Sequence, residues 1–162
     1  MTYVTGSFAK PVITDPATQQ MVSFLGGLVR TRLGAGDTDG GFSILEHTGD
    51  RGYCSPLHLH DNDEETFLVL DGTLRVEVGA EVLSVGSGGL ALLPRGLAHG
   101  FVVTSPEARF LTVHTPSGFD RFVDEIGVPP ETAAGQTPLS PQELTRIAAG
   151  HGIQIVGPPL LP

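Results

Sequence analysis

The sequence predicts an all-β domain, a barrel of jelly-roll type followed by short helices. Short stretches that alternate apolar and polar residues recur between tight turns, and no helical pattern separates them before residue 116. The chain has 22 glycines and 13 prolines while 40% of its residues are apolar, which favours many short strands over disorder. Closely spaced strands of this kind are typical of a jelly roll.

The pattern of the first third of the sequence predicts an N-terminal arm followed by two strands. Residues 1–23 carry scattered polar and turn residues, which indicate an arm with at most one edge strand. A strand with two internal glycines is expected at 24–33, and a long flexible loop at 34–41. The next strand is predicted at 42–47, and a turn at 49–52 leads out of it.

The pattern in the middle of the sequence predicts a β-hairpin and a further strand. Residues 74–78 alternate cleanly, and a turn at 79–81 joins them to a second arm at 82–85. A further strand is expected at 108–115.

After residue 116 the pattern becomes helical. Apolar residues at i, i+3, i+4 and i+7 predict a helix over 119–126, capped by Ser117 and ended by Gly127. A linker at 128–139 follows, and then a capping box formed by Ser140 and Glu143 opens a second helix that ends near residue 150. Residues 153–156 form either a short strand or a packed tail, and this segment covers either the barrel mouth or an outer face.

Length and composition bound the class of protein. A length of 162 residues suits one domain, which we divide into an arm with edge strands (1–41), a barrel core (42–115) and a C-terminal helical segment (116–162). The net charge of −9 argues against nucleic-acid binding. One cysteine excludes an internal disulfide, and the first residues lack the charged flank and apolar core of a signal peptide. No apolar run approaches the roughly 20 residues of a membrane span, so a cytoplasmic protein is expected.

One stretch inside the barrel core carries a cluster of metal-binding residue types. His58 and His60 lie on the same face of a strand, with Cα atoms roughly 6–7 Å apart. The polar run 61–64 predicts a solvated turn, after which Glu65 starts the next strand and can converge on the histidines. Glu64 competes with Glu65 for this role, and strand parity with the following residues favours Glu65.

His99 is a fourth candidate ligand, because it re-enters extended structure after a Pro-Arg-Gly turn. Three imidazoles and one carboxylate suit one divalent transition metal (Fe, Mn, Co, Ni, Cu or Zn), and not Ca or Mg.

These positions resemble the two motifs of the cupin superfamily. The pattern G-x5-H-x-H-x4-E-x6-G is met in full, from Gly52 to Gly72, and G-x5-P-x-G-x2-H-x3-N is met from Gly88 to His99 but has Val103 in place of asparagine. Shorter likenesses at 40–46, 115–119 and 152–159 resemble bacterial single-domain cupins related to quercetin 2,3-dioxygenase.

The resemblance implies a cupin jelly-roll β-barrel with short C-terminal helices, a metal held by His58, His60, Glu65 and His99, and a homodimer. It also implies a metal-dependent dioxygenase in which Glu65 takes the proton of a small enolic, hydroxylated aromatic or polyketide-like substrate that reacts with O₂. Two alternatives stay open: a non-redox isomerase, cyclase or lyase that uses the metal as a Lewis acid, and a non-catalytic cupin that binds a small ligand.

Other residues near the motifs have weaker indications. Phe67, Phe101 and Val103 share strand parity with the ligands, and they line either a substrate pocket or the ordinary barrel core. His114, on a strand predicted to face inward, is a further pocket candidate. Like His114, His47 and His151 are interpreted as surface residues or as residues that support the ligands from behind. Cys54 is interpreted as a packed small residue and Arg95 as a turn residue.

Overall fold

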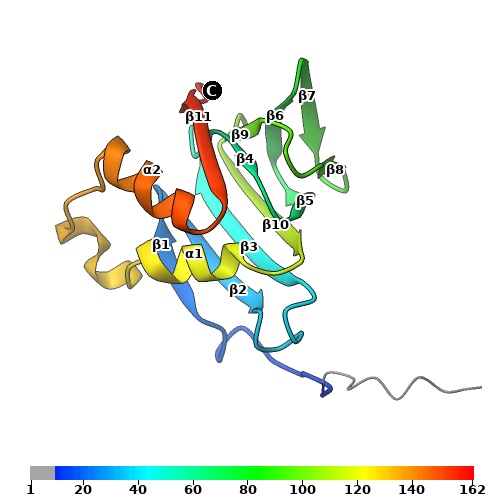
Figure 1. The fold of residues 1–162 in the computed structure, drawn as a ribbon, viewed down its shortest axis with the longest axis vertical. Helices are drawn as coiled ribbons and strands as arrows, with labels where there is room; N and C mark the ends of the chain where they lie inside the picture. Colours follow the sequence, from blue (N-terminus) through cyan, green and yellow to red (C-terminus); the bar gives the residue numbers. More distant parts are fainter. Residues whose placement is uncertain (1–9) are drawn as a thin grey trace, which may run out of the picture.

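Two antiparallel sheets enclose the core of the protein in the computed structural model, which describes residues 10–162 (Figure 1). The six-stranded sheet has the order β1-β2-β3-β10-β5-β8, and the five-stranded sheet has the order β11-β4-β9-β6-β7. The first sheet comprises β1 (Met21–Phe24), β2 (Gly27–Leu33), β3 (Ser43–Asp50), β10 (Glu107–Thr115), β5 (Glu64–Asp71) and β8 (Leu90–Leu93). The second comprises β11 (Ile153–Pro159), β4 (Pro56–His60), β9 (His99–Val103), β6 (Thr73–Val78) and β7 (Glu81–Gly86).

This arrangement confirms the predicted all-β jelly roll with short C-terminal helices. Side chains from both sheets alternate inward and build one apolar cluster between them, as strand periodicity requires. The β6–β7 hairpin forms as the alternation predicts, with Thr73 opposite Gly86.

Two strand predictions need correction at their ends. The segment predicted as one strand at 24–33 contains a turn, because Leu25 and Gly26 both have positive φ (48° and 91°), so β1 and β2 form a hairpin. β3 runs on to Asp50, although a turn was expected from residue 49, because it pairs with β10 as far as Glu107. The part of the N-terminal arm at residues 1–9 lies outside the described residues.

The C-terminal segment forms helices α1 (Phe119–Ile126) and α2 (Pro141–Gly150), with a 3-10 helix (Pro130–Gly135) inside the predicted linker. Figure 1 shows both helices on the side of β1–β3, with β11 returning beside β4. The Ser140 capping box and the end of α1 at Gly127 form as predicted. Ser117 does not cap α1, since Gly118 takes that position and the Ser117 hydroxyl donates to the carbonyl of Gly40.

The helices close one end of the barrel with a second apolar cluster. Phe122, Val123 and Ala148 pack there against the β1–β2 hairpin and β3. Ile153 of β11 joins the same cluster, so the C-terminal tail is a packed strand. Within residues 10–162, no helix is long and apolar enough to span a bilayer.

Candidate metal centre

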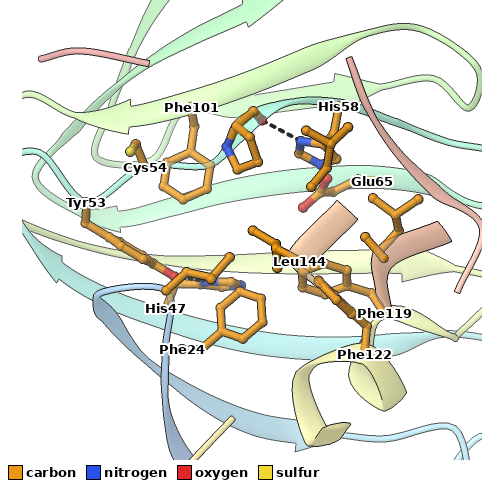
Figure 2. Close-up of a pocket in the computed structure, with 15 residues that line it drawn as sticks. Phe24, His47, Tyr53, Cys54, His58, Glu65, Phe101, Phe119, Phe122 and Leu144 are labelled. Carbon is orange, nitrogen blue, oxygen red and sulfur yellow. Dashed lines mark hydrogen bonds between the residues drawn. The ribbon is translucent and has the colours of Figure 1, made fainter. Parts of the chain in front are cut away.

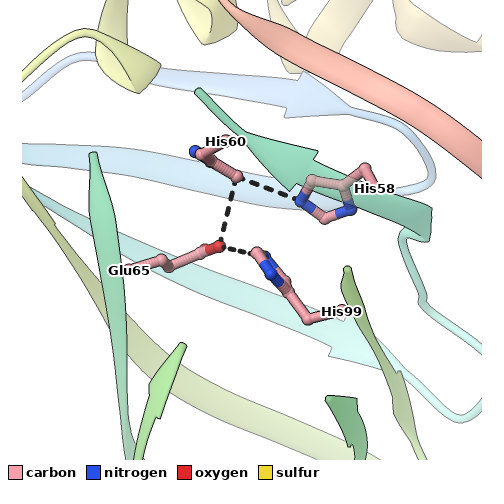
Figure 3. A group of neighbouring side chains, drawn as sticks. All are labelled: His58, His60, Glu65 and His99. Atoms are coloured by element: carbon pink, nitrogen blue, oxygen red, sulfur yellow. Dashed lines mark hydrogen bonds and ion pairs between the residues drawn. The ribbon is translucent and has the colours of Figure 1, made fainter. Parts of the chain in front are cut away.

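Three strands from both sheets bring the four candidate ligands together. β4 carries His58 and His60 on one face, β5 supplies Glu65, and β9 supplies His99, which lies directly opposite His58 in the β4–β9 ladder. All four side chains are buried, and one ligand atom from each lies within 4.8 Å of the others (Figure 3). The geometry therefore unites residues that the two motifs separate by up to 41 positions.

Hydrogen bonds on the outer side turn each imidazole inward. The Nδ1 atom of His58 lies 2.8 Å from the carbonyl oxygen of Pro56, and that of His99 lies 3.0 Å from the carbonyl oxygen of Leu97. Because these Nδ1 atoms donate to carbonyls, the Nε2 atoms are left with lone pairs that face the centre.

The inward atoms form a set that suits a transition metal ion. The Nε2 atoms of His58 and His60 lie 3.1 Å apart, and Oε2 of Glu65 lies 3.0 Å from Nε2 of His99 and 3.4 Å from Nε2 of His60. Imidazole nitrogens that face one another at this distance repel unless a proton or a cation lies between them. The residues present thus fit the group that the donor set implies.

Burial and mutual proximity shift the ionisation of these groups. Burial, and then the neighbouring His99, lower the pKa of His58 to about 3. For Glu65, burial would raise the pKa, but His114, His99 and His60 outweigh it, and the pKa lies well below the usual range. Neutral imidazole beside ionised carboxylate is the state in which such side chains bind a cation.

Glu65 and its neighbour Glu64 point in opposite directions, as strand alternation requires. The Glu64 carboxylate lies at the surface and accepts hydrogen bonds from Arg95 at 2.6 and 2.7 Å. Glu65 is therefore the carboxylate at the centre, and Arg95 is a partner of Glu64 as well as a turn residue.

Asp63 corrects the interpretation of 61–64 as a solvated turn. Its side chain is buried, with both carboxylate oxygens 3.0 Å from Nδ1 of His60 and Oδ2 2.9 Å from Nδ1 of His114. Burial would raise its pKa, but the hydrogen bonds from His114 and His60 lower it to about 2. The signal that could have revealed it is its strand parity with Glu65, which the polar composition of the run conceals.

A small apolar cavity of about 40 Å³ adjoins the centre (Figure 2). Of the four predicted pocket residues, Phe101 lines this cavity, whereas Phe67 and Val103 pack in the barrel core and His114 is bonded to Asp63. The other lining residues come from the barrel and from the C-terminal segment: Phe24, Leu25, His47, Tyr53, Cys54, Pro56, His58, Glu65, Phe119, Phe122, Leu144, Ala148, Ile153 and Ile155.

Two of these lining residues, His47 and Tyr53, are missed by sequence reasoning, which assigns His47 to the surface or to a supporting position. His47 is 2% exposed and Tyr53 is 6% exposed. No local spacing marks them, because they reach the cavity from β3 and from the loop before β4. The C-terminal segment closes the cavity through Leu144 and Ile155, so it covers the barrel mouth.

Comparison with known proteins gives one profile match and one curated relative. The profile described as Cupin domain matches residues 49–114. Quercetin 2,3-dioxygenase of Bacillus subtilis (strain 168) is 31% identical over 88 residues, which are 54% of this chain and 26% of that protein. The chain therefore spans only a minor part of the length of this relative.

Solved structures share the fold. KdgF from Halomonas sp. has a TM-score of 0.59 at 18% identity, covering 66% of this chain and 96% of its own. The polyketide cyclase RemF from Streptomyces resistomycificus has a TM-score of 0.56 at 23% identity, covering 67% and 81%. A nucleoside dehydratase of Streptomyces has a TM-score of 0.56 at 12% identity, covering 66% and 83%. Residues 49–114 therefore match a cupin domain and carry its two motifs on β4–β5 and β8–β9, the chain resembles quercetin 2,3-dioxygenase, and the solved structures share its fold.

Proposed function

We propose that this cupin is a metal-dependent dioxygenase that acts on a small enolic, hydroxylated aromatic or polyketide-like substrate. The observation that carries the proposal is the position of Glu65 and His58, which belong both to the candidate metal centre and to the wall of the apolar cavity. A substrate oxygen at this boundary lies beside the metal site while the rest of the molecule lies among apolar side chains.

The centre would hold one divalent transition metal (Fe, Mn, Co, Ni, Cu or Zn) through His58, His60, Glu65 and His99. When bound, the ion supplies stabilisation of a deprotonated substrate hydroxyl and a partner for O₂ chemistry. The protein holds the donors in place by burying them and by hydrogen-bonding the outer nitrogens of the imidazoles.

Glu65 is the residue that we propose accepts the substrate proton. Its pKa lies well below the usual range, since the surrounding histidines outweigh the effect of burial, so the carboxylate is ionised and able to accept a hydrogen bond from the substrate hydroxyl. Its Oε2 atom lies 3.0 Å from Nε2 of His99, on the side that faces the centre. The resemblance to quercetin 2,3-dioxygenase supports this role.

The lining of the cavity supports an uncharged aromatic substrate. Four phenylalanines, Tyr53 and several aliphatic side chains form its walls, and the described residues that line it include no lysine or arginine that could pair with a phosphate or carboxylate. A second cavity of about 530 Å³ shares Leu25, Cys54, Pro56, Leu144 and Ile155 with the inner one and is lined mainly by apolar residues. This volume falls in the range of small-molecule sites and offers room for the bulk of a ligand.

Metal analysis combined with O₂ uptake tests the proposal. The purified protein is assayed for metal content and then for O₂ consumption on a panel of flavonols and other enolic aromatics. We expect uptake that Glu65→Gln and His58→Ala abolish and that Glu64→Gln, a change at the adjacent exposed carboxylate, preserves. Absence of uptake with every substrate of the panel contradicts the dioxygenase.

The same experiment separates the alternatives. Turnover that persists unchanged without O₂ indicates a non-redox isomerase, cyclase or lyase at the same centre. Turnover that is insensitive to both His58→Ala and His99→Ala indicates a non-catalytic ligand-binding cupin. The homodimer, the cytoplasmic location and the single-domain division at 1–41, 42–115 and 116–162 remain part of the proposal.

A further inference from the structure

A continuous chain of buried hydrogen bonds runs from the candidate metal centre to the wall of the cavity. Oδ2 of Asp63 lies 2.9 Å from Nδ1 of His114, and Nε2 of His114 lies 3.2 Å from Oγ1 of Thr112. The same Oγ1 lies 3.1 Å from Nε2 of His47, whose Nδ1 lies 3.1 Å from the phenol oxygen of Tyr53. All five side chains are buried.

The end of this chain forms a part of the cavity wall away from the metal centre. Figure 2 shows His47 and Tyr53 together on one side of the cavity, and His58 and Glu65 on the other. Apart from His58 and Glu65 on the side of the metal centre, the cavity is lined almost entirely by apolar side chains, so His47 and Tyr53 are the main polar feature of the opposite side.

The fold is shaped to hold the two rings in this position. His47 stacks on Phe110 with ring centroids 4.9 Å apart, and Tyr53 meets the ring of Phe101 edge-on at 5.4 Å. A Cβ atom at Gly27 or at Gly49 would fall on the Tyr53 ring. The two strands β2 and β3 therefore leave space for this phenol by carrying glycine.

The hydrogen positions along this chain of hydrogen bonds follow from the Asp63 carboxylate at its start. The Asp63 carboxylate only accepts, so Nδ1 of His114 donates to it, and Nε2 of an uncharged His114 accepts from the Thr112 hydroxyl. The Thr112 oxygen then accepts from Nε2 of His47, whose Nδ1 accepts from Tyr53. For uncharged rings, this is the arrangement that satisfies every group.

The phenol oxygen of Tyr53 is consequently left with free lone pairs and no free hydrogen. Burial raises the pKa of Tyr53 and lowers that of His47 to about 3, so both groups keep these roles at neutral pH. The polar side of the cavity away from the metal centre is therefore an uncharged acceptor.

We propose that Tyr53, positioned by His47 and Thr112, accepts a hydrogen bond from a second hydroxyl group of the ligand, remote from the oxygen that lies at the metal centre. The ligand class is an uncharged aromatic enol that carries a further hydroxyl at its opposite side. This inference deepens the proposed function, since it rests on the aromatic enol class and adds the feature by which the cavity selects among its members.

Binding in the absence of O₂ tests this proposal independently of any turnover. The full chain is loaded with Zn²⁺, and the Kd values of two flavonols are measured anaerobically by calorimetry. One flavonol carries only the enol hydroxyl, and the other carries one additional hydroxyl at the far end of the ring system. We expect the second to bind about two- to thirteenfold more tightly, as one net hydrogen bond of about 0.5–1.5 kcal/mol implies.

Three variants and one control test whether the preference for the second flavonol depends on the chain of hydrogen bonds. Tyr53→Phe removes the acceptor and keeps the ring, and Thr112→Val removes both hydrogen bonds of Thr112 at constant shape; each should bring the ratio of the two Kd values toward one. Thr112→Ser keeps the hydroxyl and should retain the ratio. Thr48→Val, on the same strand as His47 but one residue along and on the opposite face, is the matched control and should also retain it.

A ratio near one in the unmodified protein overturns the proposal, and so does an undiminished ratio in Tyr53→Phe. Near-ultraviolet circular dichroism and zinc content show whether each variant is folded. If Thr112→Val fails to fold, the comparison of Tyr53→Phe with Thr112→Ser still decides. Failure to consume O₂ would contradict the proposed function while leaving this binding preference measurable.

Discussion

At the scale of single residues, Asp63 is the side chain on which the geometry of the metal centre depends most. Its carboxylate is the only protein partner, among the described residues, of the outer nitrogen of His60. It also fixes His114, whose ring stacks on Phe119 of α1 with centroids 4.4 Å apart. Asp63 thus orients one ligand directly and ties the centre to the helix that closes the cavity.

Replacing Asp63 with asparagine should weaken metal binding by about 10–100-fold, the usual cost of losing a partner that orients a metal-binding histidine. The amide carries no negative charge, so its oxygen accepts from the two imidazole N–H groups more weakly than the carboxylate does. Competition with a chromophoric chelator measures the affinity.

Asp61→Asn is the control, because Asp61 lies in the same turn and its oxygen can still accept from Gln154. Equal metal affinity in the two variants would show that Asp63 has no orienting role.

His47 predicts how the metal-free protein responds to acid. Its pKa falls from 6.5 to about 3 in the folded state, chiefly because it is buried, so between these pH values the unfolded chain binds more protons. Stability therefore decreases as the pH falls from 6.5 toward 3. His47→Gln should reduce the slope by about 1.4 kcal/mol per pH unit, the value for one proton.

Urea denaturation of chelator-treated protein at several pH values measures this slope. Tyr53→Phe is the control, since it breaks the same hydrogen bond but leaves the titrating imidazole. If His47→Gln and the unmodified protein lose stability in parallel, His47 is not a source of the acid sensitivity.

The sequence predicts which side chains lie together when these residues are close to one another along the chain. His58, His60 and Glu65 converge because one strand–turn–strand unit carries them, so their spacing is sufficient to predict the cluster. His47 and Thr112 meet only because β3 pairs with β10, and no spacing along the chain marks that contact. The polar groups of the cavity wall therefore need the three-dimensional structure.

At the scale of elements, the glycines of the motifs fix the turns that align the strands. Gly72 joins β5 to β6 with φ of +83°, and a Cβ there would meet the carbonyl oxygen of Glu107 and lie 2.7 Å from Cα of Ala108. Gly88 has a similar φ of +80° but nothing within 4 Å of an added Cβ. An added side chain would meet backbone strain alone at Gly88, and both backbone strain and steric overlap at Gly72.

Gly72→Ala should destabilise the protein by more than Gly88→Ala. The latter carries only the cost of a left-handed conformation, about 1–2 kcal/mol, whereas Gly72→Ala must also displace the backbone of β10. Urea denaturation of both variants gives the comparison. Equal losses of unfolding free energy in the two variants would mean that β10 moves away from the new methyl group without destabilising the protein.

Hairpins and capped helices are the elements that sequence predicts well, because local turn chemistry specifies them. The β6–β7 hairpin and the Ser140 capping box form as expected. The ends of β3 and the cap of α1 are predicted less well. β3 is lengthened by its pairing with β10, and Ser117 is engaged by Gly40, and both partners are distant in sequence.

At the scale of the whole molecule, the candidate ligands belong to both sheets. His58, His60 and His99 lie on β4 and β9 of the five-stranded sheet, and Glu65 lies on β5 of the six-stranded sheet. A cation held by all four would join the two layers of the barrel, so its binding energy would add to the stability of the fold rather than to a single loop.

Metal addition should therefore raise the thermal unfolding midpoint, and a chelator should reverse the rise. At a free metal concentration 100-fold above Kd, binding stabilises the folded state by about 2.7 kcal/mol, and each kcal/mol shifts the midpoint of a domain of this size by roughly 2–4 °C.

The shift should shrink as the pH falls, because protons compete for the imidazoles. Burial lowers the pKa of His60, but Asp63 and Glu65 raise it above its ordinary value overall, so His60 takes up a proton at a higher pH than a free imidazole does. Scanning calorimetry with and without Zn²⁺ at several pH values measures this dependence. His99→Ala should show little of the shift, and a rise of the same size in that variant would place the bound metal outside the centre.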